Sequence, residues 1–509
     1  MLTFLALGMF AVACAALLRG YNVAFTLGGV GILFAAIGTA LGYFDSTDMI
    51  NLPGRIYPII TREILIAVPL FVFMGVMLEK SKIAEDLLES MGNLLGPMRG
   101  GLGVSVVMVG ALLAASTGIV GATVVTMGLL SLPTMLKRNY APDLASGAIA
   151  ASGTLGQIIP PSIVLVILGD QMSNANQEAI RSHGADAGRV VSVGDLFAGA
   201  LIPGLILVGL YALYIAIVAF MKPEKAPAQS WPQNVNPWRF VGDTLKAMLP
   251  PLLLIVAVLG SILLGYATPT RGAAIGALGA ILLATYKTAP QTWARFVAVI
   301  AVASMSAMIA IDVMEITNQI ALLLAAISMI CVGLSLIPLL KSGQLAEVSR
   351  TTMHITCMVF VILIGATIFS LIFRGFGGDE LVAGWLDAAP GGMWGAFALV
   401  MLVMFFLGFF LDFIEITFVV VPLVAPPLLA AGMDPVWLGI LMALNLQTSF
   451  LTPPFGFALF YLRGVSPPEV TTTALYRGVI PFIAIQFIVI LMVVFWPELA
   501  TSLPEKMLN

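Results

Sequence analysis

The stretches SGTLGQIIPPS (Ser152 to Ser162) and LNLQTSFLTPPFG (Leu444 to Gly456) are short polar interruptions inside long apolar segments. The chain around them has 509 residues, of which 60% are hydrophobic and 10% charged, and its mean hydropathy is +1.06. This composition carries more apolar surface than a water-soluble core needs, so it predicts an all-α polytopic membrane protein. Two such interruptions in one chain predict two discontinuous helices around a transport site.

Apolar segments of about 17 to 25 residues recur along the chain, each long enough to cross about 30 Å of hydrocarbon. Two segments carry polar residues near their middle, ASTGIVGAT (115–123) and LDFIEIT (411–417). Their arms are too short to cross the bilayer, which predicts two re-entrant helical hairpins. The expected hairpins cover residues 102–134 and 393–430, and each precedes a broken helix, over residues 141–169 and 436–462.

Proline spacing indicates an internal duplication. Pro160 and Pro161 match Pro453 and Pro454 at an offset of 293 residues, and the same offset relates two further pairs, Pro133 with Pro426 and Pro142 with Pro435. Counting Lys and Arg by compartment places 16 of the 23 on one side, which favours both termini outside and hairpins that enter from opposite faces. Opposite hairpins predict an inverted repeat.

The expected organisation follows from these features. It consists of a first repeat over 1–221, a Pro-rich cytoplasmic linker over 222–247, a second repeat over 248–496 with extra helices over 297–340, and a C-terminal tail over 497–509.

The chemistry of the interruptions favours a monovalent cation. Gly153 and Gly156 permit unusual torsions, and Pro160 and Pro161 remove two donors, so we expect carbonyl groups without helical partners. Neutral oxygens beside such carbonyls suit Na⁺ better than Ca²⁺ or Mg²⁺, which recruit carboxylates. These side-chain oxygens belong to Ser116, Thr117, Ser152 and Thr154 in the first half, and to Asn445, Thr448, Ser449 and Thr452 in the second.

Asp412 and Glu415 are ionisable groups at the second hairpin tip, so they are functional candidates, with a salt bridge or solvent exposure as the alternative. Unpaired N–H groups at the hairpin and broken-helix N-termini favour an anionic substrate, and a carboxylate is the natural choice. The sequence carries no nucleotide, zinc-protease or nucleophile motif and no basic cluster for nucleic acid, so we expect neither an enzyme nor an organic cofactor.

Five motifs together resemble one family. They are ASTGIVGAT, SGTLGQIIPPS, VSVGDLFAGALIPG (191–204), FLGFFLDFIEIT (406–417) and LNLQTSFLTPPFG. The chain is similar to the large membrane subunit of tripartite ATP-independent periplasmic (TRAP) transporters. The resemblance implies an inverted-repeat, ion-transporter-like elevator fold in a bacterial inner membrane. It also implies sodium-driven uptake of a small organic anion with two partners, a small four-helix membrane subunit and a soluble periplasmic binding protein.

The resemblance also implies where ligands bind. One Na⁺ is expected between Ser116, Thr117 and Gly118 on one side and Ser152, Gly153, Thr154 and Gly156 on the other. A second is expected between Asp412 and the loop that carries Asn445, Thr448, Ser449 and Thr452. Substrate is expected between the hairpin tips, near Ser116, Thr117, Pro160, Pro161, Pro453 and Pro454.

Two features depart from the family pattern. Residues 290–345 look like an additional helix pair, and TPTRGA (268–273) has Arg271 where the family commonly has Glu. The alternative is a stand-alone sodium- or proton-coupled anion symporter that needs no binding protein. A membrane scaffold or a channel is the other class, and it predicts no ion-coupled uptake.

Overall fold

The computed structural model describes residues 1–45, 47–118, 120–183, 191–229, 237–289, 292–313 and 318–508. Within these ranges all regular secondary structure is helical and no strand is present, which confirms the expected all-α fold class. Seven of the described helices are long and apolar enough to cross a membrane, or nine when each of two bent helix pairs counts as one span. Other apolar helices have 10 to 17 residues. One of them, Pro435–Leu451, is short because it ends at the second polar interruption.

One group of helices packs around α16. Its members are α1 (Leu2–Leu18), α2 (Val23–Ala40), α5 (Ala67–Lys80), α13 (Pro269–Thr288) and α16 (Gln344–Gly375). The closest approach within it is at Gly365 of α16, where an added Cβ would lie 3.1 Å from the carbonyl carbon of Ala24. Small residues let these two apolar helices pack backbone to backbone. We call this group the α16 group.

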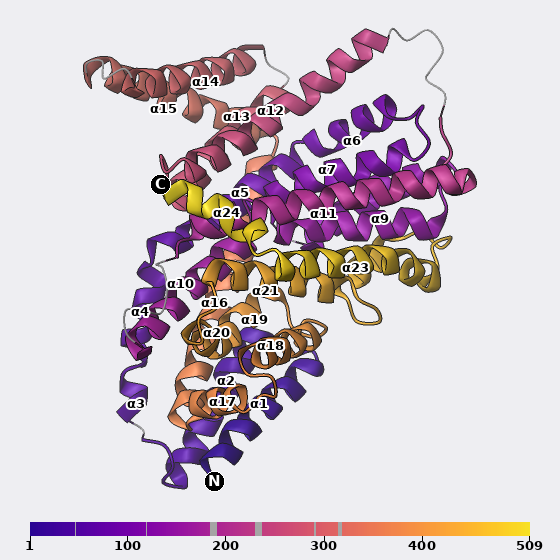
Figure 1. Cartoon of the computed structure of the whole chain (residues 1–509). Coiled ribbons are helices and arrows are strands. Elements are labelled where there is room, and N and C mark those ends of the chain that lie inside the picture. Colours follow the sequence, from indigo (N-terminus) through magenta and orange to yellow (C-terminus); the bar gives the residue numbers. More distant parts are fainter. Residues whose placement is uncertain are drawn as a thin grey trace.

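A second group holds the two polar interruptions. Its members are α7 (Gly101–Thr117), α8 (Val120–Lys137), α9 (Pro142–Thr154), α21 (Pro435–Leu451), α22 (Phe457–Val465) and α23 (Thr472–Phe495). In Figure 1, α7, α9 and α23 run side by side, with α11 (Val193–Met221) along them. We call this set the hairpin group.

The remaining helices connect and cover these groups. They are α3 (Thr47–Ile50), α4 (Leu52–Thr61), η1 (Glu63–Ile66), α6 (Ile83–Leu94), η2 (Leu155–Gln157), α10 (Ile163–His183), η3 (Pro223–Lys225), α12 (Pro237–Leu263), α14 (Thr292–Val313), α15 (Asn318–Lys341), α17 (Gly378–Asp387), α18 (Met393–Leu407), α19 (Phe413–Val419), α20 (Val421–Ala430) and α24 (Glu498–Leu508).

Both expected hairpins form as helix, turn and helix. In the first, α7 and α8 have 17 and 18 residues, so its arms are longer than the sequence pattern suggested, and its re-entrant placement stays a prediction. In the second, α18 is followed by α19 and α20, which meet at a 56° bend. Pro422 lies at the start of α20 and lacks the N–H that a continuous helix needs, which explains the bend.

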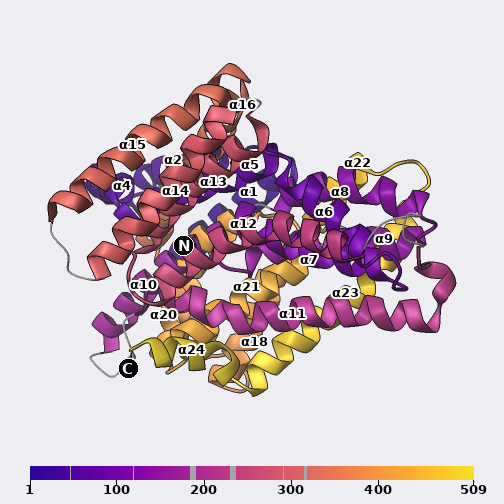
Figure 2. The same ribbon diagram turned by 90° about the horizontal axis from the view of Figure 1, so that it is seen from above.

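The residues expected as extra helices form α14 and α15. They pack on each other and on α13, and the hydroxyl oxygens of Ser304 and Ser328 lie 2.7 Å apart between them. Figures 1 and 2 both place the pair at the edge of the molecule, away from α18 and α23. The pair therefore adds to the α16 group without reaching the polar interruptions.

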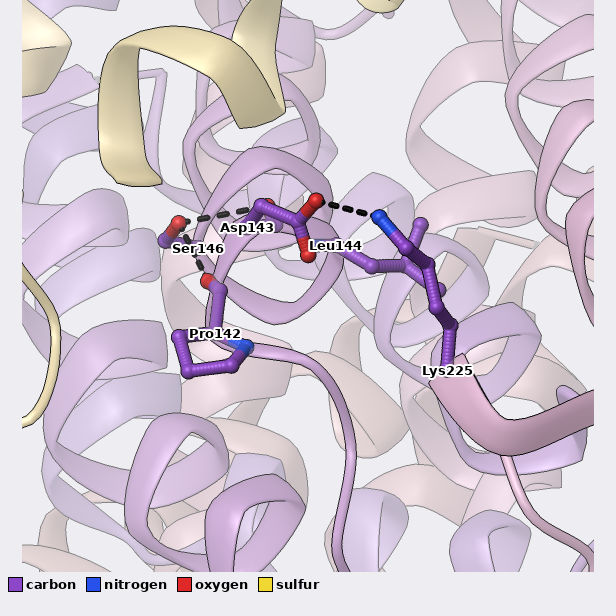
Figure 3. A network of polar contacts seen from close by, with 5 residues as sticks. All are labelled: Pro142, Asp143, Leu144, Ser146 and Lys225. Atoms are coloured by element: carbon purple, nitrogen blue, oxygen red, sulfur yellow. Dashed lines mark hydrogen bonds and ion pairs between the residues drawn. The ribbon is translucent and has the colours of Figure 1, made fainter. Parts of the chain in front are cut away.

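The segment expected as a cytoplasmic linker has structure at both ends. Its first residues lie against the open end of the first hairpin, where the Ala141 N–H donates to the Lys225 carbonyl (2.9 Å) and the Gly100 N–H to the Ala226 carbonyl (3.0 Å). The Lys225 ammonium also pairs with Asp143 in the first turn of α9 (2.6 Å; Figure 3). The other end is helical, because α12 begins at Pro237 within the expected linker.

The C-terminal residues expected as a tail form α24, which packs on α11.

Candidate functional site

The tip of the first hairpin abuts the break in the first discontinuous helix. Gly118 ends α7 in the left-handed conformation (φ +62°), and its N–H donates to the Ala114 carbonyl (3.1 Å). An added Cβ on Gly118 would lie 3.0 Å from the backbone nitrogen of Ile163, the first residue of α10. Glycine is therefore needed there both for its torsion and for the close approach. The turn of the hairpin and the N-terminus of α10 thus meet at one point.

The first break begins later than the sequence suggested. The α-helix continues through Gly153 to Thr154, a 3₁₀ turn covers Leu155 to Gln157, and α10 resumes at Ile163. The expectation that Gly153 and Gly156 supply unusual torsions is wrong, since neither has a positive φ.

These two glycines instead allow close packing of the hairpin arms. An added Cβ on Gly153 would clash with Val124 of α8, 3.2 Å from its Cα, and one on Gly156 would lie 3.2 Å from the Ala114 carbonyl oxygen of α7. Because both arms press against the break, its backbone is held between them.

The expected free carbonyls of the first break have a partner. Pro160 and Pro161 cannot donate to the carbonyls of Gly156 and Gln157, which lie four residues earlier. The Ser162 hydroxyl lies 2.7 Å from the Gly156 oxygen and 3.4 Å from the Gln157 oxygen, so its one hydrogen is donated chiefly to the Gly156 carbonyl. Neither carbonyl accepts from a backbone N–H among the described residues, as expected, but the Gly156 carbonyl is not free, because it accepts from the nearby Ser162 hydroxyl.

The second break has the same form. Helix α21 continues through Thr448 to Leu451, the chain is non-helical from Thr452 to Gly456, and α22 starts at Phe457. The Pro160–Pro161 and Pro453–Pro454 peptide bonds are both cis.

Polar side chains attach α21 to the first arm of the second hairpin. The Asn445 amide donates to the Met401 carbonyl (2.7 Å), and the Ser449 hydroxyl donates to the Phe405 carbonyl (2.6 Å). Close contact also occurs at Gly408, where an added Cβ would lie 2.5 Å from the Ser449 Oγ. The donor groups of Asn445 and Ser449 thus hold the hairpin in place.

The threonine hydroxyls donate within their own helices. Thr154 donates to the Ala151 carbonyl (2.8 Å), Thr448 to the Leu444 carbonyl (2.8 Å), and Thr452 to the Thr448 carbonyl (2.7 Å). A hydroxyl that donates its hydrogen keeps two acceptor lone pairs. These oxygens therefore remain able to coordinate a hard cation such as Na⁺.

The burial of the expected site residues differs between the breaks. Ser152, Thr154, Asn445, Thr448 and Ser449 are buried, as are Pro160 and Pro161, whereas Thr452 and Pro453 are half-buried and Pro454 is exposed. The side chains of Ser116 and Thr117 lie outside the described residues.

Asp412 and Glu415 form a reciprocal cap at the second hairpin tip. The Asp412 carboxylate accepts from the Phe413 N–H (2.7 Å), and the Glu415 carboxylate accepts from the Asp412 N–H (3.0 Å). This capping box starts α19 and orders the turn before it. Asp412 therefore has a structural role at the tip.

The structure also brings together residues that the sequence reasoning did not select. The Gln447 amide lies 3.4 Å from the Thr154 hydroxyl, which joins the two broken helices directly. Gln447 is fully buried and its carbonyl oxygen has no partner among the described residues. The signal was present in the sequence, because Thr154 and Gln447 are separated by the repeat offset of 293 residues.

Comparisons with known proteins agree with this architecture. The family described as "Tripartite ATP-independent periplasmic transporter, DctM component" matches residues 8–340 and 339–499. The sialic acid TRAP transporter large permease protein of Vibrio cholerae is 26% identical over 494 residues, covering 97% of each chain. The C4-dicarboxylate TRAP transporter large permease protein of Pseudomonas aeruginosa is 26% identical over 464 residues, covering 91% of each.

A further relative is the ectoine TRAP transporter large permease protein of Halomonas elongata, which is 25% identical over 442 residues and covers 87% of this chain and 86% of its own. Among solved structures, the YdaH transporter of Alcanivorax borkumensis is similar with a TM-score of 0.53 at 15% sequence identity. That likeness covers 97% of this chain and 99% of the other. At this identity it shows a shared fold alone.

Proposed function

The chain belongs to the DctM component family of TRAP transporters, and from this premise we propose that it imports a small organic anion by coupling its movement to that of Na⁺. Membership makes it a multi-pass inner-membrane permease subunit of a secondary transporter. The proposal concerns the identity of the coupling ion, the class of the transported solute and the motion that carries it.

The observation that carries the sodium proposal is the set of buried hydroxyl oxygens on the helical turns that lead into the two breaks. They belong to Ser152 and Thr154 before the first break and to Thr448 and Ser449 before the second. Neutral oxygens that are already oriented by backbone hydrogen bonds favour a monovalent cation. Each Na⁺ that crosses a potential of 100 mV contributes about 2.3 kcal/mol, so excess sodium charge drives uptake of the anion.

The proposed motion is an elevator movement along the α16 group, made by the hairpin group together with α10 and the second hairpin (α18, α19 and α20). Within the hairpin group the two breaks are joined through Gln447 and Thr154, and the linker residues Lys225 and Ala226 bind the first hairpin. A body tied internally in this way moves as a unit and carries both breaks together.

The proposed partners are a small four-helix membrane subunit and a soluble periplasmic binding protein. Relatives named as large permease proteins of TRAP transporters support this proposal. The stand-alone symporter remains the alternative, and reconstituted chain that takes up solute without either partner would favour it.

Sodium binding tests the proposal without knowledge of the solute. The purified chain is heated in NaCl and in KCl at equal ionic strength, and the unfolding midpoint is expected to be higher in NaCl. A ligand at 100 times its dissociation constant stabilises the folded state by about 2.7 kcal/mol.

Thr154→Ala and Thr448→Ala should each reduce this sodium-specific difference. Thr61→Ala is the matched control, because its hydroxyl donates to the Tyr57 carbonyl (2.9 Å) in the same way but on an exposed helix. Equal midpoints in the two salts for the unaltered chain, or an unchanged difference in both break variants, would contradict the sodium assignment.

A further inference from the structure

Two cavities lie beside each other where α4, α10, α16 and the second hairpin meet. They share two lining residues, Arg374 and Pro422. The first has a volume of about 390 Å³ and is lined by Arg55, Arg62 and Arg374, and we call it the arginine cavity. None of the expected ion- or substrate-binding residues lines it.

The second cavity has a volume of about 410 Å³, and we call it the acidic cavity. Four carboxylates line it, those of Glu178, Asp379, Glu380 and Asp387.

The two cavities have opposite charge. Three guanidinium groups and one carboxylate, that of Asp170, line the arginine cavity, which gives a formal charge of +2. Four carboxylates and Arg374 give the acidic cavity a formal charge of −3. A cleft lined by one sign of charge concentrates ions of the other sign.

The positive charge of the arginine cavity is only partly neutralised. Arg62 donates to both carboxylate oxygens of Asp170, at 2.8 and 2.7 Å. Arg374 donates through both Nη atoms to Glu178, at 3.0 and 3.2 Å, while its Nε is buried and has no acceptor among the described residues. Arg55 is exposed and has no carboxylate partner in the part of the chain that the structure describes.

The cavity spans the boundary between the fixed and the moving parts of the proposed transporter. Arg55 lies within α4, which packs on α16, Arg62 caps the end of α4, and Arg374 lies in the last turn of α16. Asp170, by contrast, belongs to α10, which starts at the first hairpin tip. Phe418 and Pro422 of the second hairpin complete the wall. In the topology predicted from the sequence, these three arginines are among the seven Lys and Arg residues that remain on the outer side.

We propose that the arginine cavity binds the carboxylate of the incoming organic anion at the outer face, before the anion reaches the hairpin tips. This inference rests on the proposed function, which supplies the direction of transport and the anionic solute. Guanidinium groups bind carboxylates through paired, charge-assisted hydrogen bonds, so the solute competes with Asp170 and Glu178 for the same donors. The acidic cavity excludes the anion from the neighbouring surface.

Cysteine labelling tests the electrostatic part of the proposal. Cys14, Cys331 and Cys357 are first replaced by alanine. Ser370→Cys then places a thiol in the arginine cavity, and Ala383→Cys places a matched, half-buried thiol in the acidic cavity. Each is treated in detergent with an anionic and a cationic methanethiosulfonate reagent, which differ in charge.

The measured quantity is the ratio of the labelling rate of the anionic reagent to that of the cationic reagent. This ratio should be higher at Ser370→Cys than at Ala383→Cys. A local potential of one kT changes this ratio about sevenfold. Arg55→Gln should lower the ratio at Ser370→Cys and leave Ala383→Cys unchanged, and because Arg55 is exposed this variant keeps the fold intact. Equal ratios at the two positions, or no effect of Arg55→Gln, would overturn the proposal.

Protection tests the binding part. Succinate, used as a generic carboxylate probe, should slow labelling of Ser370→Cys and leave labelling of Ala383→Cys unchanged. Absence of protection at concentrations up to tens of millimolar would overturn an anion site. These labelling measurements need no sodium gradient and no uptake. A failure of the sodium proposal would therefore appear in the unfolding midpoints, whereas a failure of the outer anion site would appear in the labelling rates.

Discussion

Gly147 in α9 packs against the backbone of Gly478 in α23, and its replacement by alanine is expected to disturb the first break. An added Cβ on Gly147 would lie 2.5 Å from the carbonyl carbon of Gly478 and 3.1 Å from its Cα. Ordinary contact starts at 3.4 Å, and the Gly478 carbonyl oxygen lies nearer to the added Cβ than its carbon does, so the helices must separate by more than 0.9 Å. Both neighbours are backbone atoms, which cannot rotate away as a side chain can.

Overpacking of this kind costs about 1–3 kcal/mol. We expect Gly147→Ala to lower the unfolding midpoint in detergent by a few degrees. Because α9 carries Ser152 and Thr154, the same displacement should also reduce the extra stability that NaCl confers over KCl. Gly478→Ala should behave alike, since an added Cβ there would clash with the Asp143 carbonyl of α9 and lie 3.1 Å from the Gly147 nitrogen.

The matched control is Gly209→Ala in α11, where nothing lies within 4 Å of the added Cβ. Alanine is the better helix former by up to about 1 kcal/mol, so this variant should be unchanged or slightly more stable. If Gly147→Ala and Gly209→Ala had the same midpoint and the same sodium response, the argument from close backbone contact would be refuted.

Two further substitutions follow from the geometry of the breaks. Ser162→Ala removes the only hydroxyl within hydrogen-bonding distance of the Gly156 and Gln157 carbonyls in the described structure. It should lower the free energy of unfolding by about 1–3 kcal/mol and alter the sodium dependence of the unfolding midpoint. An unchanged midpoint would contradict this prediction. Asp412→Ala should lower the free energy of unfolding by about 1 kcal/mol, because the helix cap is lost, and should weaken sodium-dependent uptake. Asp412→Asn retains capping, so it should recover stability but not uptake. Equal uptake by the two Asp412 variants and the unaltered chain would leave that carboxylate a purely structural role.

Hydropathy, proline spacing and the polar motifs were enough to predict the all-α class, the hairpins and the approximate places where two helices break. They sufficed because lipid demands continuous apolar helices, so a glycine- and proline-rich polar stretch is conspicuous in this chain. The repeat offset also holds in space, where it relates Thr154 to Gln447 across the interface of the two broken helices.

Which polar groups stay free at the breaks depended on tertiary packing. The prolines predicted carbonyls without helical partners, and the fold supplies the Gly156 carbonyl with the Ser162 hydroxyl as a donor. Gly153 serves a close contact with Val124 in place of an unusual torsion. Likewise, Arg62 and Arg374 line one cavity although they are far apart in the chain. Hydropathy and motif spacing describe neighbours along the backbone, whereas hydrogen-bond satisfaction and local charge depend on which distant segments the fold brings within a few ångströms.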